Sequence, residues 1–340
     1  MDFFGLDIGS QKIKLVKLAK SGNNQYRLSA LGNTTSTQKG LLSDAEGDLT
    51  ALATIIKKLH QEAKITTKNV VSALPQDQVF TQVITLPQLS EDELLSALKW
   101  EAEQYVPIPL SEVTLSHQII GQVKENAKQK IEVLVAAAPT RLIDKLLLVL
   151  RAAGLNPVSL EIEIMALARS LVPPSPEVVM VVDLGAKATD FAVVENGQVI
   201  FVRSIATAGE ALTRAVATGL GLDPNQAEAY KKAYGADPKQ LEGKVVGAIA
   251  PVMEVIVAEM EKIIQFHQLE KKKTLNRIIL TGGTASLPEI SSLLAKKLNL
   301  EIQSGDPFLQ IVKDNLVAKI PPADISSYSI ATGLAMKEMA

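Results

Sequence analysis

The stretch FFGLDIGSQKIKLVKL, residues 3–18, joins two apolar, strand-like runs through a Gly-Ser-Gln turn. The first run carries Asp7, and the second alternates apolar residues with Lys12 and Lys14, which places both lysines on one side of the returning strand. An ordinary hairpin with surface lysines accounts for this pattern on its own. A carboxylate, a glycine and two lysines around one turn also suit a bound anion, because the turn's amide groups form an anion-binding concavity.

A second copy of the pattern begins at Val182, in the other half of the chain. Residues 182–187, VDLGAK, repeat the order apolar, Asp, apolar, Gly, small, polar of residues 6–11, LDIGSQ. One Asp-x-Gly is a common turn, whereas one copy in each half predicts a two-lobed repeat architecture. We expect Gly9 and Gly185 to adopt positive φ and admit a ligand close to the backbone. Asp7 and Asp183 are expected to hold Mg²⁺ through ordered water.

A third glycine-rich segment follows the apolar run Ile278–Leu280. Thr281-Gly282-Gly283-Thr284 lies between this run and a helical pattern, for which Ser286 and Glu289 are expected to form the N-terminal cap. Two adjacent glycines at a strand-to-helix junction let a flat group lie against bare backbone. A plain tight turn also fits this segment when it is taken alone.

Composition narrows the classes of protein and the kinds of site. The chain has 340 residues, 47% of them hydrophobic, enough for two domains of ordinary size. Its formal net charge of −2 gives no basic surface for nucleic acid. The absence of cysteine excludes disulfides and thiolate chemistry, and the three histidines have no metal-binding spacing. No apolar run approaches the roughly 20 residues that a membrane span needs, so a cytoplasmic protein without direct membrane insertion is expected.

Strand-like and helix-like runs alternate along the chain, which predicts an α/β fold. Residues 76–160 follow a β-α-β-β-α-β order that we interpret as an inserted subdomain; a continuation of one sheet is the alternative. Ser90 and Glu93 have the spacing of a capping box at the start of its first helix. Pro173-Pro174-Ser175-Pro176 forms a stiff segment and the clearest domain boundary.

Taken together, the three glycine-containing segments resemble a known set of motifs. Asp7-Ile8-Gly9-Ser10, Asp183-Leu184-Gly185 with Thr189, and residues 280–283 resemble, in this order, the phosphate 1, phosphate 2 and adenosine motifs of the actin–Hsp70–hexokinase superfamily. Residues 227–231, AEAYK, resemble the segment whose Glu and Lys line the adenosine pocket of bacterial actin-like proteins. Residues 330–335, IATGLA, resemble the helix that crosses between the lobes.

Within this superfamily the chain resembles the PilM family of type IV pilus assembly proteins, which is similar to the division protein FtsA. The resemblance implies an actin-like two-lobed fold with an inserted subdomain of the FtsA/PilM type. The first lobe (1A) would comprise residues 1–75 and 161–175, completed by a helix at 325–340, and the inserted subdomain (1C) residues 76–160. The second lobe (2A) would comprise residues 176–225 and 273–324, and subdomain 2B residues 226–272.

The resemblance also implies that ATP or ADP, with Mg²⁺, lies between the lobes. The residues expected at the nucleotide are Asp7, Gly9, Ser10, Gln11, Lys12, Lys14, Asp183, Gly185, Ala186, Lys187, Thr189, Gly209, Glu228, Lys231, Lys232, Gly282, Gly283 and Thr284. Two positions depart from the family pattern. Ala208 stands where a glycine is usual and is expected to narrow the contact, and Lys187 replaces a small hydroxyl residue, which either strengthens triphosphate binding or fills the site.

For function, the resemblance implies docking of the cytoplasmic N-terminal peptide of PilN in a groove between 1A and 1C. Other pilus assembly proteins would be further partners, the protein would lie at the inner face of the inner membrane through a partner, and a homo-oligomer is left open. Because this chain stops just after the interlobe helix, an FtsA-type amphipathic membrane anchor is not expected.

Hydrolysis needs a group that orients water toward the γ-phosphate. Glu161 and Glu163 are weak candidates for this role, and the alternative is that both are simply acidic residues in the first turn of a helix. The protein is therefore interpreted as a nucleotide-binding scaffold and at most a slow ATPase. An FtsA-like division scaffold and a small-molecule kinase of the same superfamily are the alternatives, and an Hsp70-like chaperone is disfavoured because no peptide-binding domain follows.

Overall fold

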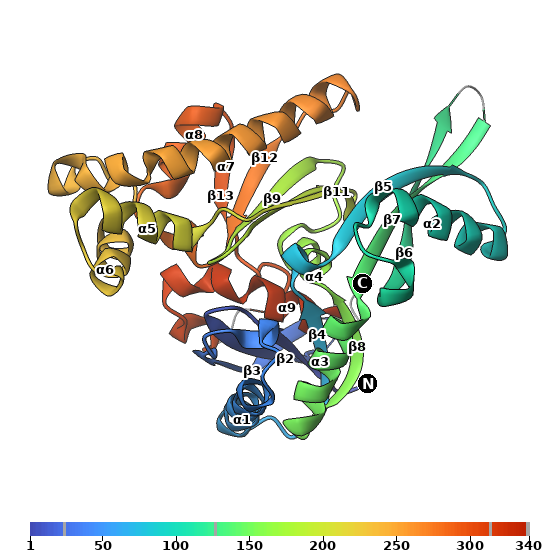
Figure 1. Cartoon of the computed structure of the whole chain (residues 1–340), viewed down its shortest axis with the longest axis horizontal. Coiled ribbons are helices and arrows are strands. Elements are labelled where there is room, and N and C mark those ends of the chain that lie inside the picture. Colours follow the sequence, from blue (N-terminus) through green and yellow to red (C-terminus); the bar gives the residue numbers. More distant parts are fainter. Residues whose placement is uncertain (23–24, 126–127, 313–314, 338–340) are drawn as a thin grey trace.

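Two five-stranded sheets form the framework of the molecule (Figure 1). The computed structural model describes residues 1–22, 25–125, 128–312 and 315–337. Its strands are β1 (Phe4–Ile8), β2 (Lys12–Lys20), β3 (Tyr26–Thr35), β4 (Asn69–Leu74), β5 (Phe80–Pro87), β6 (Val113–Glu125), β7 (Lys128–Pro139), β8 (Asn156–Ile162), β9 (Val178–Leu184), β10 (Thr189–Glu195), β11 (Gln198–Ile205), β12 (Arg277–Thr281) and β13 (Glu301–Ser304). Its α-helices are α1 (Glu46–Glu62), α2 (Glu91–Tyr105), α3 (Thr140–Ala152), α4 (Glu163–Leu171), α5 (Gly209–Leu220), α6 (Pro224–Tyr234), α7 (Lys244–Leu269), α8 (Ile290–Leu298) and α9 (Ser329–Ala335).

The two sheets have the same strand order. The first runs β3-β2-β1-β4-β8 and the second β11-β10-β9-β12-β13. In both, three antiparallel strands at one side are followed by two strands that run parallel to the third. The repeat expected from the two Asp-x-Gly segments is therefore confirmed at the level of whole lobes. Asn196 and Gly197, with φ of 51° and 76°, form the tight turn between β10 and β11.

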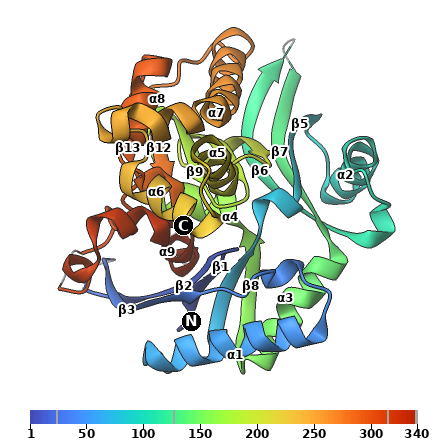
Figure 2. The same ribbon diagram turned by 60° about the vertical axis from the view of Figure 1, so that its left-hand side comes forward.

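Apolar central strands and amphipathic helices build the core of each lobe. Every residue of β9, VVMVVDL, is buried, as expected for a strand covered on both faces. In the first lobe, α1 and α3 pack side by side against the sheet, and their apolar faces join its core (Figure 2). In the second lobe, α5 and α7 contribute Leu212, Met253 and Met260. No helix in the described part of the chain is long and apolar enough to cross a membrane.

The inserted unit is smaller than the sequence predicts. It consists of a three-stranded sheet, β5-β7-β6, with α2 packed on one face through Leu94 and Leu98. The Ser90–Glu93 capping box at the start of α2 is confirmed. The expected membership of the last helix and strand is wrong, because β8 pairs in parallel with β4 and α3 buries Leu146 and Leu150 in the first lobe. The inserted order is thus β-α-β-β.

Helix α9 closes the first lobe from the C-terminal side and packs against α4 and β1. Two glycines make this packing close: a Cβ on Gly5 would lie 2.2 Å from the carbonyl oxygen of Ala331, and one on Gly333 would lie 1.9 Å from that of Ala166. The expected C-terminal helix at 325–340 is therefore present as a 3₁₀ segment (Pro322–Tyr328) and α9, and residues 338–340 lie outside the described residues.

Candidate functional site

The two Asp-x-Gly hairpins have the same register. Asp7 lies opposite Lys14, and Asp183 lies opposite Asp190, seven residues later in each copy. The expectation of positive φ at Gly9 and Gly185 is wrong, since neither is in that region. The reason for glycine is the close approach across the turn: a Cβ at either position would lie 2.8 Å from a carbonyl oxygen, that of Lys12 or Ala188.

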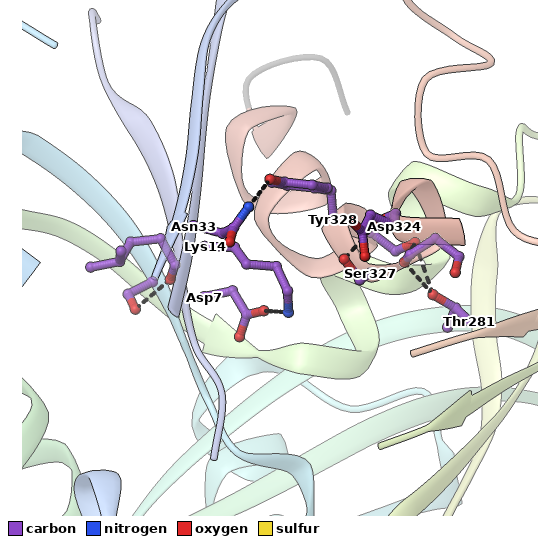
Figure 3. Close-up of polar contacts among 11 residues, drawn as sticks. Asp7, Lys14, Asn33, Thr281, Asp324, Ser327 and Tyr328 are labelled. Atoms are coloured by element: carbon purple, nitrogen blue, oxygen red, sulfur yellow. Dashed lines mark hydrogen bonds and ion pairs between the residues drawn. The ribbon is translucent and has the colours of Figure 1, made fainter. Parts of the chain in front are cut away.

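The first hairpin carries one internal ion pair. Lys14 Nζ lies 3.2 Å from Asp7 Oδ2 (Figure 3), and Asp7 is only 2% exposed. The other oxygen, Asp7 Oδ1, is buried without a hydrogen-bond partner within the described residues. Gln11 and Lys12 at the turn are exposed and Ser10 is partly exposed. The first hairpin therefore has a buried carboxylate oxygen without a hydrogen-bond donor, and its turn has polar side chains that a ligand can reach.

The second hairpin places two carboxylates opposite each other. Burial raises the pKa of Asp183 to about 6; Lys14 opposes this shift and Asp7 adds to it. Burial also raises the pKa of Asp190 to about 7, with a hydrogen bond from Ser204 opposing and the charge of Asp183 adding. Sequence reasoning missed Asp190, although its spacing from Asp183 equals that of Lys14 from Asp7.

The structure separates the two candidate glutamates. Glu163, the first residue of α4, lies near the carboxylates of both hairpins. Burial first, and then Asp7 and Asp190, raise its pKa well above the usual value. The backbone N–H of Gln76 donates to Glu163 Oε2 at 2.9 Å. Glu163 therefore belongs to a carboxylate cluster, which we define as Asp7, Asp183, Asp190 and Glu163.

Glu161 has a structural role instead. It lies in β8 rather than in the first turn of α4, so the helix-start interpretation holds only for Glu163. Arg169 donates to both of its oxygens, at 2.8 and 2.9 Å, and Lys337 Nζ lies 2.8 Å from Oε2. Burial opposes ionisation, but these cations lower the pKa of Glu161. A carboxylate held by two cations is poorly suited to activate water.

The double glycine after β12 has one constrained and one open member. Gly282 has φ of 89°, and a Cβ there would lie 2.2 Å from Asp183 Oδ1. A Cβ on Gly283, which is exposed, would have no atom within 4 Å. Thr284 Oγ1 donates to the carbonyl of Gly185 at 2.9 Å and so links this turn to the second hairpin. The expected cap of α8 is wrong, since Ser286 ends a 3₁₀ turn (Thr284–Ser286) and Glu289 caps with its backbone in the left-handed region.

A lysine–glutamate pair braces the start of α5. Gly209 N donates to the carbonyl of Gly185 at 3.1 Å, and a Cβ on Gly209 would lie 2.5 Å from Thr284 Oγ1. Lys231 Nζ donates to the Gly209 carbonyl at 3.0 Å and lies 2.6 Å from Glu228 Oε2. Burial opposes ionisation of Glu228, yet hydrogen bonds from Lys231, Thr213 and Lys232 lower its pKa to about 2.

The other residues expected at the nucleotide differ in whether a ligand can reach their side chains. Thr189 is buried, and its hydroxyl donates to the carbonyl of Thr207 at 2.7 Å. Ala186 O accepts from Glu210 N at 2.8 Å, and Ala208 is buried at the N-cap of α5. Lys187 is partly exposed. Among the described residues, no group of three or more His, Cys, Asp or Glu side chains is arranged to hold a metal directly.

A groove of about 590 Å³ lies between the first lobe and the inserted sheet. Leu160, Ile162 and Met165 form one side, Leu134 and Ala136 of β7 form another, and the β10–β11 turn at Gly197–Val199 contributes a third. No α2 residue lines this groove, and Trp100 on α2 is 64% exposed. Sequence reasoning assigned none of these residues to the groove.

Comparison with known proteins places the chain in a family. The model of the family described as "Type IV pilus assembly protein PilM" matches residues 5–339. Among curated relatives, cell division protein FtsA of Enterococcus hirae is 23% identical over 88% of this chain and 77% of its own length, and FtsA of Streptococcus pneumoniae is 22% identical over 88% and 74%.

Solved structures agree with this result. A PilM–PilN type IV pilus biogenesis complex contains a chain that is 29% identical, with a TM-score of 0.85 and coverage of 100% of this chain and 99% of that one. The ethanolamine utilization protein EutJ of Carboxydothermus hydrogenoformans shares the fold, at 17% identity, a TM-score of 0.60 and coverage of 98% and 88%. The expected actin-like fold is confirmed, and this chain belongs to the PilM family of type IV pilus assembly proteins.

Proposed function

We propose that this PilM-family protein is a nucleotide-binding component of the pilus assembly complex, with Mg²⁺-ATP or ADP held between the two Asp-x-Gly hairpins. The observation that carries the proposal is the carboxylate cluster, into which both hairpins and α4 place acids around Lys14. Oδ1 of Asp7 and Oδ1 of Asp190 have no hydrogen-bond partner in the part of the chain that the structure describes, so both suit hydrogen bonds from water molecules on a hydrated Mg²⁺. This arrangement supports cation binding through water rather than direct ligation by three side chains.

The expected purine and phosphate contacts have matching local geometry. The open face of Gly283 suits a flat base, and the turn residues Ser10, which is partly exposed, and Gln11, which is exposed, suit phosphate oxygens. A bound magnesium ion would supply charge neutralisation at the phosphates. Glu163 is the residue of this chain placed to orient a water, whereas Glu161 is held by cations, so any hydrolysis is proposed to depend on Glu163 and to be slow.

We further propose that the groove between the first lobe and the inserted sheet docks the N-terminal peptide of the cognate PilN. The groove is lined mainly by aliphatic side chains, with the polar Glu161, Arg169 and Lys337 also on its lining. The most similar chain described above comes from a PilM–PilN complex. Docking of this kind would hold the protein at the inner face of the cytoplasmic membrane, near other assembly proteins.

Calorimetric titration of Mg²⁺-ATP tests the nucleotide site. Wild-type protein should bind, and Asp183→Ala and Gly283→Trp should each weaken binding about tenfold or more, which corresponds to about 1.4 kcal/mol. Unchanged affinity in both variants would refute the site.

A labelled PilN N-terminal peptide, followed by fluorescence anisotropy, tests the groove. The competing kinase interpretation would gain support if peptide binding failed and small-molecule phosphorylation were detected.

A further inference from the structure

A second cavity lies on the other face of the inserted sheet, beside α2, and is called here the α2 pocket. Helix α2 covers the outer side of this sheet, away from the two lobes (Figure 2). The pocket has a volume of about 220 Å³. Leu134 and Ala136 of β7 line the groove described above, whereas Val135 and Ala137 line the α2 pocket. Because successive residues of a strand point to opposite faces of a sheet, the groove and the α2 pocket are separate sites.

The α2 pocket combines a buried apolar interior with two accessible aromatic rings. Ile84, Ala102 and Val135 are buried members of its lining. Phe80 at the start of β5 and Tyr105 at the end of α2 also line it, and their side chains are 36% and 51% exposed. Aromatic side chains that line a cavity and remain accessible are typical of sites where another protein binds.

Glu101 is the carboxylate on the lining of the α2 pocket. It is partly buried, and in the described part of the chain it accepts no hydrogen bond and forms no ion pair. No lysine, arginine or histidine among the described residues lines the pocket. Because apolar neighbours deprive a carboxylate of water, an unpaired Glu101 favours a cation supplied from outside.

The segment that carries the α2 pocket is strongly acidic. Residues 76–112 contain seven acids and one lysine, although the whole chain has a net charge of only −2. The acids are Asp77, Glu91, Asp92, Glu93, Glu101, Glu103 and Glu112, and the lysine is Lys99. This charge repels nucleic acid and anionic lipid, and the volume is below the roughly 300–1,000 Å³ of small-molecule pockets. A cationic side chain of another polypeptide matches both the charge and the size.

We propose that the α2 pocket docks an arginine side chain from a basic segment of a partner protein. The apolar stem of an arginine packs against the buried interior. Its planar guanidinium stacks on an aromatic ring, for which Tyr105 and Phe80 are available, and donates two parallel hydrogen bonds to the carboxylate of Glu101. Lysine has neither the flat face nor the paired donors. The α2 pocket is thus a second partner-binding surface, and it depends on neither the nucleotide nor the groove.

NMR titration of the isotope-labelled full-length protein with N-acetyl-L-arginine methylamide tests the pocket. Backbone amide signals of residues 80–84 and 101–106 should shift, and Glu101→Gln should weaken the fitted affinity about three- to fivefold. N-acetyl-L-citrulline methylamide has nearly the same shape without the charge, and it should bind the wild type about three- to fivefold more weakly than the arginine compound does. Glu103→Gln, an exposed position on α2 outside the pocket lining, is the matched control and should keep the wild-type affinity. The pocket assignment is overturned if these signals do not move, or if Glu101→Gln and Glu103→Gln have equal effects.

Synthetic peptides that tile the cytoplasmic segments of the other pilus assembly proteins extend the test to a partner. At least one arginine-containing peptide should bind, and its affinity should fall about three- to fivefold when its arginine is replaced by citrulline or when the protein carries Glu101→Gln. Tyr105→Ala should also weaken it, because the stacking surface is lost. If no peptide is sensitive to Glu101→Gln, docking of a partner is refuted. A dimer in sedimentation velocity that Glu101→Gln abolishes would identify a second copy of this chain as the occupant and would likewise refute it.

The PilN N-terminal peptide separates this inference from the proposed function. It should bind Glu101→Gln as tightly as the wild type, because the groove lies on the opposite face of β7. An equal loss of PilN binding in Glu101→Gln would show that the pocket belongs to the PilN site and would overturn the second surface. Failure of the arginine compound to bind leaves the groove and the nucleotide site untouched.

Discussion

The buried carboxylate of Asp190 should make the protein less stable as pH rises. Its pKa is 3.8 in an ordinary setting and about 7 in the folded protein. Between these values the folded state holds a proton that the unfolded state has lost, so the free energy of unfolding decreases as pH increases from about 4 to about 7. At about 1.36 kcal/mol per pKa unit, the full loss from this group is about 4 kcal/mol.

Substitution by asparagine removes this titration and keeps the size of the side chain. Any cost of burying the amide is the same at every pH, so the pH dependence of the difference between Asp190→Asn and wild type comes from the Asp190 carboxylate and from its effect on the pKa of Glu163. The unfolding free energy of the variant relative to that of the wild type should increase by about 2.5 kcal/mol from about pH 5 to about pH 8. The wild-type curve alone is not diagnostic, because burial lowers the pKa of His267 to about 4 and gives an opposite slope in the same range.

Urea denaturation without nucleotide or divalent cation measures this effect. Both proteins are unfolded at the two pH values, and the difference in unfolding free energy is compared. Asp144→Asn, at an exposed position on α3, serves as the control and should show no comparable change. A difference between Asp190→Asn and wild type that stays constant with pH would show that Asp190 ionises in the folded state as freely as in the unfolded chain, and would refute the reasoning.

Two further predictions concern packing and the buried histidine. Gly333→Ala should lower the unfolding free energy by about 3 kcal/mol, because its Cβ would lie 1.9 Å from the carbonyl oxygen of Ala166. Gly47→Ala, on α1 with open space around it, should instead raise the unfolding free energy by about 0.5–1 kcal/mol. Equal effects of the two substitutions in thermal denaturation would contradict this account. His267→Leu should stabilise the protein increasingly as pH falls from about 6.5 to about 4, by about 2 kcal/mol at about pH 5 relative to pH 8, because both ring nitrogens are buried without partners in the described structure. A pH-independent effect in urea titrations would rule out a neutral buried imidazole.

Local pattern was sufficient to predict the two hairpins and the lobes that they belong to. The alternating pattern around Asp7 and Asp183 determines which residues pair across each hairpin once the position of the turn is known. The two sheets have the same strand order, as the repeat predicts. The mistaken membership of α3 and β8 has a different cause. Whether β8 pairs with β4 or with the inserted sheet depends on a parallel contact between segments more than 80 residues apart, and no local periodicity encodes it.

The candidate site was predicted unevenly for a similar reason. Glu161 and Glu163 are two positions apart and would share one side of a continuous strand. Because β8 ends at Ile162 and α4 begins at Glu163, the two glutamate side chains have different surroundings. Glu161 binds Arg169, and Glu163 lies near the other acids of the carboxylate cluster. Gly5 and Gly333 show another limit: each is required by the backbone of a distant segment, so neither carries a local signal.

The two copies of the hairpin share a backbone but not a charge, and this difference bears on the ligand. The residue opposite the aspartate is Lys14 in the first copy and Asp190 in the second. Four acids of the carboxylate cluster then stand against one lysine, an excess of three negative charges when all are ionised. Burial is the first cause of the raised pKa values of Asp183, Asp190 and Glu163, and the neighbouring carboxylates add to it, so the cluster favours taking up protons or a cation. A free triphosphate would add to the repulsion, whereas its magnesium complex brings the missing positive charge. The asymmetry therefore supports the proposal that a nucleotide would bind here as its magnesium complex rather than as the free triphosphate.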